Sequence, residues 1–148
     1  MVGKPLRIVT MFESDVGVAF DTTANIILTQ QGSIYTFSFH NGDVTLGTEM
    51  INLGTESVHL EVISNIAVVT HPSCVSVVDL QSLAVKKVTP GGQIIRAVLW
   101  GEYIFSSSTK GEYLMTAIHT NVSRLVGTAA QSVSFTVLDD NLVYVNGS

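Results

Sequence analysis

Val16-Gly-Val-Ala-Phe20 is the first of four copies of a short pattern in which the first, third and fifth residues are apolar. Each copy runs through a polar turn into a second apolar run, so two consecutive segments match in every copy. The copies begin 42, 37 and 38 residues apart, an average of 39. A fixed period of this kind indicates a repeat architecture. The other copies are Val58-His-Leu-Glu-Val62, Ile95-Arg-Ala-Val-Leu99 and Val133-Ser-Phe-Thr-Val137.

Two further extended runs follow in each of the three complete repeats, so every complete repeat is predicted to hold four short strands. In the second repeat these runs are Val75 to Leu80 and Leu83 to Val88. β-branched and aromatic residues fill these runs, and turn residues such as Asn41-Gly42 and Trp100-Gly101 bound them. No clean helical stripe is present, so we expect essentially no helix. The predicted repeats cover residues 16–57, 58–94 and 95–132, with a partial repeat over 133–148 and a leader strand within 1–15.

Four-stranded units that repeat at roughly 40–45 residues are typical of β-propeller blades. The run from Cys74 to Val88 resembles the third and fourth strands of a WD-repeat blade, with Val78-Asp79 at the position of the Trp-Asp dipeptide. The segments 32–44 and 111–119 resemble the same third strand. Because no Gly-His dipeptide is present and one repeat keeps the aspartate, the resemblance implies a degenerate, WD-repeat-like propeller.

The strand count predicts an all-β propeller fragment of about three and a half blades, whereas about four blades make the smallest closed ring. The two end blades would therefore each leave an apolar face in water. A second copy of the chain, a partner protein or further sequence would cover these faces. A β-trefoil is the alternative fold, since three units of four strands at about 40 residues each also make a complete domain.

The composition excludes several classes of protein. Of 148 residues, 46% are apolar and 13% charged, which excludes a disordered chain. The net charge of −5 and the pI near 5.1 make nucleic acid an unexpected partner. No signal peptide and no transmembrane segment are readable, and Cys74 has no second cysteine to pair with. We therefore expect a cytoplasmic protein without a membrane partner.

The sequence shows no motif for catalysis or for nucleotide binding. His71-Pro-Ser-Cys74 has the spacing of some zinc ligands but lacks a second pair, and Asp139-Asp140-Asn141 is expected to be a hairpin turn. We expect no catalytic residues, no cofactor and no metal. A propeller-based enzyme stays an alternative, because such sites assemble residues from several blades.

Candidate partner-binding residues come from two regions of the predicted propeller. The first strand of each blade lines the central channel, where His59, Glu61 and Arg96 are the strongly polar residues. The rim consists of the loops between second and third strands and between blades, and we expect anchoring side chains there. The rim candidates are His71, Lys110, Gln93 and Glu56. These features favour a non-enzymatic protein-interaction or scaffold module.

Overall fold

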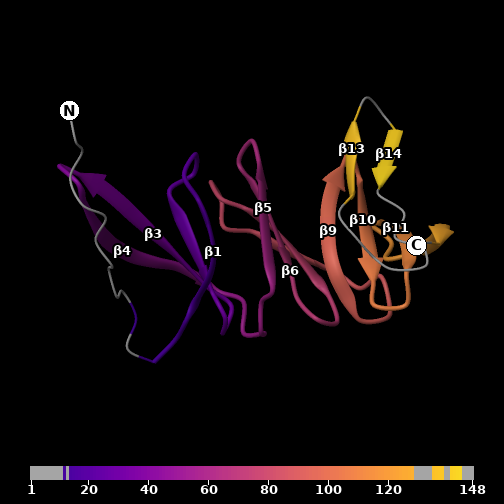
Figure 1. Ribbon diagram of the computed structural model, residues 1–148, viewed down its shortest axis with the longest axis horizontal. Helices are drawn as coiled ribbons and strands as arrows, with labels where there is room; N and C mark the ends of the chain where they lie inside the picture. Colours follow the sequence, from indigo (N-terminus) through magenta and orange to yellow (C-terminus); the bar gives the residue numbers. More distant parts are fainter. Residues whose placement is uncertain (1–11, 13, 129–134, 139–140, 145–148) are drawn as a thin grey trace.

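The computed structural model describes residues 12, 14–128, 135–138 and 141–144. Fourteen β-strands and no helix occur within these residues (Figure 1). This described part therefore contains no helix with the length and apolar character needed to cross a membrane. The predicted leader strand, apart from Phe12, Ser14 and Asp15, lies outside the described residues, as do both ends of the predicted partial repeat.

Consecutive strands pair antiparallel to form three four-stranded sheets and one two-stranded sheet. The first sheet contains β1 (Gly17–Asp21), β2 (Ile26–Thr29), β3 (Ser33–His40) and β4 (Asp43–Asn52). The second sheet contains β5 (His59–Ile63), β6 (Ile66–Thr70), β7 (Val75–Asp79) and β8 (Val85–Val88). The third sheet contains β9 (Ile94–Trp100), β10 (Tyr103–Ser108), β11 (Glu112–Ala117) and β12 (Ser123–Thr128), and the C-terminal hairpin contains β13 (Phe135–Leu138) and β14 (Asn141–Tyr144).

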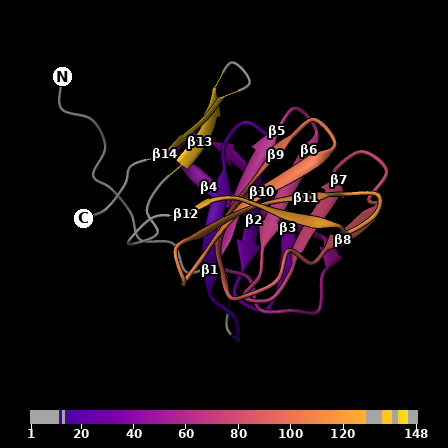
Figure 2. The same cartoon turned by 90° about the vertical axis from the view of Figure 1, so that its right-hand side faces the viewer.

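The sheets stand face to face in a row that follows the order of the sequence (Figure 1). Their first strands are neighbours along this row, with β1 against β5, β5 against β9, and β9 against β13. Viewed along the row, the three four-stranded sheets overlap one another, and the hairpin β13–β14 lies to one side of them (Figure 2). The β-trefoil alternative is wrong, because each sheet is completed by the strands of one repeat instead of a barrel being shared by three units.

The core lies between successive sheets because side chains alternate between the two faces of each strand. Ile26 and Leu28 of β2 face the second sheet and pack in one cluster with Ala67 and Val69 of β6. The intervening Val68 lies in a separate cluster shared with the third sheet. The second sheet is thus covered on both faces, which explains the almost continuous apolar sequence of β6.

The turns explain why most strands lie where the sequence predicts them and why one strand, β8, begins later than predicted. Asn41 and Gly42 have φ values of 52° and 83°, as a type I′ hairpin turn requires. The fourth strand of the second repeat was expected to begin at Leu83, but β8 begins at Val85. The Asp79 carboxylate accepts hydrogen bonds from two following backbone amides, and Leu83 adopts a φ of 64°. This closed turn keeps Leu83 out of the strand.

Candidate interaction surfaces

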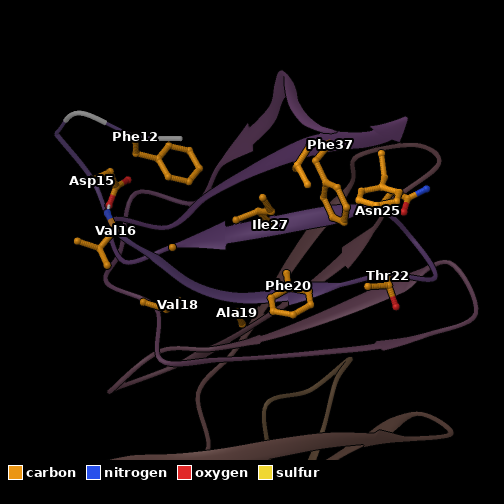
Figure 3. Close-up of a pocket in the computed structure, with 13 residues that line it drawn as sticks. Phe12, Asp15, Val16, Val18, Ala19, Phe20, Thr22, Asn25, Ile27 and Phe37 are labelled. Atoms are coloured by element: carbon orange, nitrogen blue, oxygen red, sulfur yellow. Dashed lines mark hydrogen bonds between the residues drawn. The ribbon is translucent and has the colours of Figure 1, made fainter. Parts of the chain in front are cut away.

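The first sheet has one face covered by the second sheet and one face open to solvent. On the open face lies a groove of about 1260 Å³, lined mainly by apolar side chains of β1, β2 and β3 (Figure 3). Phe20 and Phe39 are 69% and 68% exposed, although large apolar side chains are normally buried. The Phe12 ring lies at the border of the groove, 5.2 Å from the ring of Tyr35.

The open face repeats a surface that is buried elsewhere in the chain. In each four-stranded sheet the penultimate residue of the first strand pairs with the second residue of the second strand. In the first sheet this pair is Phe20 and Ile27, and it borders the groove. The equivalent pairs lie in the cores against the preceding sheet; they are Val62 with Ala67 and Leu99 with Ile104. Within the described residues, the first sheet therefore presents a contact face that no other sheet covers.

The repeat pattern predicts an open apolar face on an end blade but does not single out the residues that form it. The available signal is the run Ile26-Ile27-Leu28, which is apolar at every position. Such a run is typical of a strand covered on both faces. In the structure Ile26 and Leu28 are buried, whereas Ile27 lines the groove.

Asp15 lies at one end of the groove. Its carboxylate accepts hydrogen bonds from the backbone amides of Val16 (2.8 Å) and Gln31 (3.3 Å). Burial raises the pKa of this carboxyl, but hydrogen bonds from the Thr29 side chain and from these amides outweigh burial and lower it overall. Asp15 thus remains ionised and fixes the start of the first sheet, which is a structural role.

The three predicted channel residues come together on the inner strands β5 and β9. Nη2 of Arg96 lies 3.1 Å from Oε1 of Glu61, so an ion pair joins the second and third sheets. Burial lowers the pKa of His59, Glu61 opposes this change and Arg96 adds to it. Among the described residues, neither Nδ1 of His59 nor Oε2 of Glu61 has a hydrogen-bond partner. The cluster is therefore a partly buried polar contact between neighbouring sheets.

We expect Glu61 and Arg96 to couple measurably in a double-mutant cycle. Single and double replacement by alanine should give a coupling energy of about 0.5–1 kcal/mol, because both side chains are partly shielded from water. Urea unfolding of the four proteins measures it. The control is the pair of Glu102 and His119, whose side-chain atoms lie 3.9 Å apart and are mostly exposed. That pair should show no coupling, and equal coupling in both cycles would contradict the expectation.

Three rim candidates are exposed on loops that the backbone ties together. The amide of Ser57 donates to the carbonyl of Gln30, and the amide of Thr109 donates to the carbonyl of Gln93, each at 2.9 Å. Glu56 directly precedes Ser57, and Lys110 directly follows Thr109. The side chains of Glu56, Gln93 and Lys110 are all exposed. A hollow of about 390 Å³ lies beside Glu56, bordered by residues 30, 31, 54 and 55.

His71 differs from the prediction because its side chain is fully buried and is not part of the rim surface. Its Nδ1 donates to the carbonyl of Glu56 at 2.8 Å and lies 3.3 Å from Oγ of Ser57. Its Nε2 accepts a hydrogen bond from Oγ of Ser76 at 2.8 Å. These contacts fasten the connection between the first and second sheets to β7. His71 thus has a structural position.

The His71-Pro-Ser-Cys74 segment does not gather metal ligands in this structure. Both ring nitrogens of His71 already have hydrogen-bond partners. Burial raises the pKa of the Cys74 thiol, with Lys87 opposing this effect. Within residues 12, 14–128 and the two described strands of the hairpin, no three acidic, histidine or cysteine side chains are grouped as a metal ion would require. The segment instead leads from β6 into β7.

The row of four-stranded sheets, with their first strands adjacent, defines a fragment of a β-propeller. No family model matches the sequence, and no curated protein matches it. Among solved structures, the chain is similar to the computationally designed Ika4 protein, with a TM-score of 0.63 and 18% identity over 95% of this chain and 91% of that chain.

Two further solved structures share the fold and extend beyond it. The computationally designed Ika8 protein gives a TM-score of 0.57 at 17% identity, and the match covers 86% of this chain and 41% of that chain. The N-terminal domain of Nup159 gives 0.55 at 9% identity, covering 85% of this chain and 36% of that chain. At these identities the similarity shows the fold alone.

Proposed function

We propose that the protein is a non-enzymatic protein-interaction or scaffold module, a WD-repeat-like propeller fragment whose open first sheet is covered by another protein surface. The observation that carries this proposal is the exposed apolar face around Phe20 and Phe39. Phe20 occupies the position at which the second and third sheets pack Val62 and Leu99 against a neighbouring sheet. A cytoplasmic location belongs to the same proposal and is supported by the single, unbridged cysteine.

The energy available from this face supports a protein partner. Burial of an exposed aromatic or aliphatic side chain is worth about 1.5–3 kcal/mol. Phe20 and Phe39 alone therefore offer several kcal/mol, and Ile27 and Phe37 extend the same surface. Aromatic residues at the centre of an apolar patch are also the residue type that most often dominates binding energy at interfaces.

The polar groups near this face argue for binding over catalysis. The Asp15 carboxylate is already held by backbone amides. Glu61 and Arg96 pair with each other on the inner strands, away from the groove. A general acid or base needs a perturbed group within reach of a substrate cavity. The groove residues instead offer apolar contact area.

Photocrosslinking tests the proposal in cells that produce the chain. Phe39 is replaced by p-benzoylphenylalanine, a photoreactive aromatic residue, and Ser38 is replaced in a control protein. Because successive side chains lie on opposite faces of a strand, the control places the same reagent on the other face of β3. We expect a covalent adduct with a second polypeptide from position 39 only, weakened by Phe20→Lys. The same adducts from both positions, or none from position 39, would overturn the proposal.

A further inference from the structure

We propose that the surface covering the open first sheet is the C-terminal hairpin of a second copy of this chain, and that two copies close one ring head to tail. This inference rests on the proposed function and names its partner. Each copy would present its first sheet to the hairpin of the other. The two joints would then be identical, as in other closed symmetric dimers.

The hairpin carries an apolar residue, Val143, at a register position that joins successive sheets within the chain. Val143 is the third residue of β14 and pairs with Thr136. The third residues of β2, β6 and β10 are Leu28, Val68 and Phe105. Leu28 and Val68 lie in the cores between their own sheet and the next one. The position of Val143 therefore belongs to the face that a following sheet would cover.

The first sheet is suited to be that following sheet. Phe20 and Ile27 occupy the register positions of Val62 and Ala67, the pair that contacts the sheet before it. A joint between the hairpin of one copy and the first sheet of another would repeat the joint between the first and second sheets. No new type of contact is needed, because both of its surfaces already occur inside one chain.

The number of sheets favours two copies. The described residues of each chain form three four-stranded sheets and one two-stranded sheet. Closed propellers contain typically about 4–8 blades. The described sheets of two chains together amount to about seven blades' worth of strands, a number within this range.

The chain cannot make this joint with its own hairpin. The first sheet lies at one end of the row, whereas the C-terminal hairpin lies beside the third sheet at the other end, so the second sheet separates them (Figure 1). The open face around Phe20 is directed away from the second sheet. The hairpin β13–β14 therefore reaches that face from a second copy of the chain, and solved chains of the same fold extend beyond the portion that this chain matches.

Sedimentation equilibrium of the full 148-residue chain tests the inference. The expected mass is twice the chain mass of 15.9 kDa. Phe20→Lys alters the open face and Val143→Asp alters the hairpin face, and each alone should weaken dimerisation by at least about 30-fold, as loss of an interface anchor does. Leu83→Asp changes an exposed apolar side chain in a turn of the second sheet and should leave the dimer intact. Circular dichroism verifies that each variant keeps its strands.

Mixing the two variants separates the head-to-tail arrangement from other dimers. The Phe20→Lys chain has a native hairpin and the Val143→Asp chain has a native first sheet, so the mixture regains one native joint. The other joint brings together two introduced charges of opposite sign. We expect dimers in the mixture at concentrations where neither variant alone forms them. A monomeric native chain, or Val143→Asp remaining dimeric while Phe20→Lys does not, would overturn the inference.

The photocrosslinking experiment separates failure of this inference from failure of the proposed function. An adduct from position 39 with a different polypeptide, together with a monomeric native chain in the centrifuge, would retain the interaction module and reject self-association. The absence of any adduct would reject both. An adduct with a second copy of the chain would support both.

Discussion

Replacement of Gly32 by alanine is expected to lower the free energy of unfolding by about 3 kcal/mol or more. Gly32 has a φ of +91°, which a residue with a side chain adopts at a cost. A Cβ atom at this position would also overlap the backbone carbonyl oxygen of Thr55. The same turn is fixed by a 2.7 Å hydrogen bond from the Leu53 amide to the Gly32 carbonyl. Urea unfolding monitored by circular dichroism measures the loss.

Gly54→Ala is the matched control for this prediction. Gly54 also has a positive φ, +72°, but no atom lies within 4 Å of the place where its Cβ would stand. The control should lose only about 1 kcal/mol, the cost of the left-handed conformation itself. The difference between the two variants then reports the close approach of the β2–β3 turn to the segment after β4. Equal losses of unfolding free energy in the two variants would show that the close contact between Gly32 and the Thr55 backbone does not affect stability.

His71→Ala is the second large effect and should cost about 2–4 kcal/mol of stability. The substitution leaves a cavity in a fully buried position and removes the partners of the Glu56 carbonyl and the Ser76 hydroxyl. Ser76→Ala removes only the hydrogen bond to Nε2 and should cost about 1 kcal/mol. Denaturant unfolding of both variants at pH 7.5 measures these values, and a larger loss for Ser76→Ala would contradict the assigned role of His71.

Stability should also fall in acid partly through His71. Burial lowers the pKa of His71 in the folded protein below its ordinary value of 6.5, Lys87 adds to this effect, and the hydrogen bond to Glu56 opposes it. The unfolded chain therefore binds a proton first as the pH drops. The contribution of neutral His71 is complete above pH 6.5 and is lost as the pH falls through the folded pKa.

The comparison with His71→Ala isolates this effect from other groups, because burial lowers the pKa of His59 too. The stability difference between the native protein and the variant should shrink between pH 7.5 and pH 5. A difference that stays constant over this range would mean that His71 does not titrate differently in the two states.

The architecture was largely predictable because it depends on local sequence. Each sheet is formed by neighbouring strands, so the alternation of apolar residues and turns such as Asn41-Gly42 report strand positions directly. The exception at Leu83 arises from the side chain of Asp79, which organises a closed turn over residues 79–84. Strand positions predicted from hydrophobicity alone do not account for hydrogen bonds of this kind between a side chain and the backbone.

The candidate surfaces were less predictable because they depend on which residues become covered. His71 looked like a polar loop residue, yet three oxygen atoms satisfy its ring and allow full burial. Phe20 looked like an ordinary strand residue, yet it is exposed because no sheet of the described residues covers this face of β1. Glu61 and Arg96 were both assigned to the first strands of their blades, but their ion pair also depends on the relative height of β5 and β9, which the sequence does not specify.

The pairing of strands only with their sequence neighbours also bears on synthesis at the ribosome. The first sheet can assemble its backbone hydrogen bonds once residue 52 has emerged, before most of the chain has been translated. Each later sheet can then pack against the sheet before it, which has already folded. The loops that must close are therefore short, and these short closures make up most of the entropic cost of folding. The sheets would then fold one after another from the N-terminal end. A gene extended by one more four-stranded repeat would add a sheet without disturbing the sheets already folded.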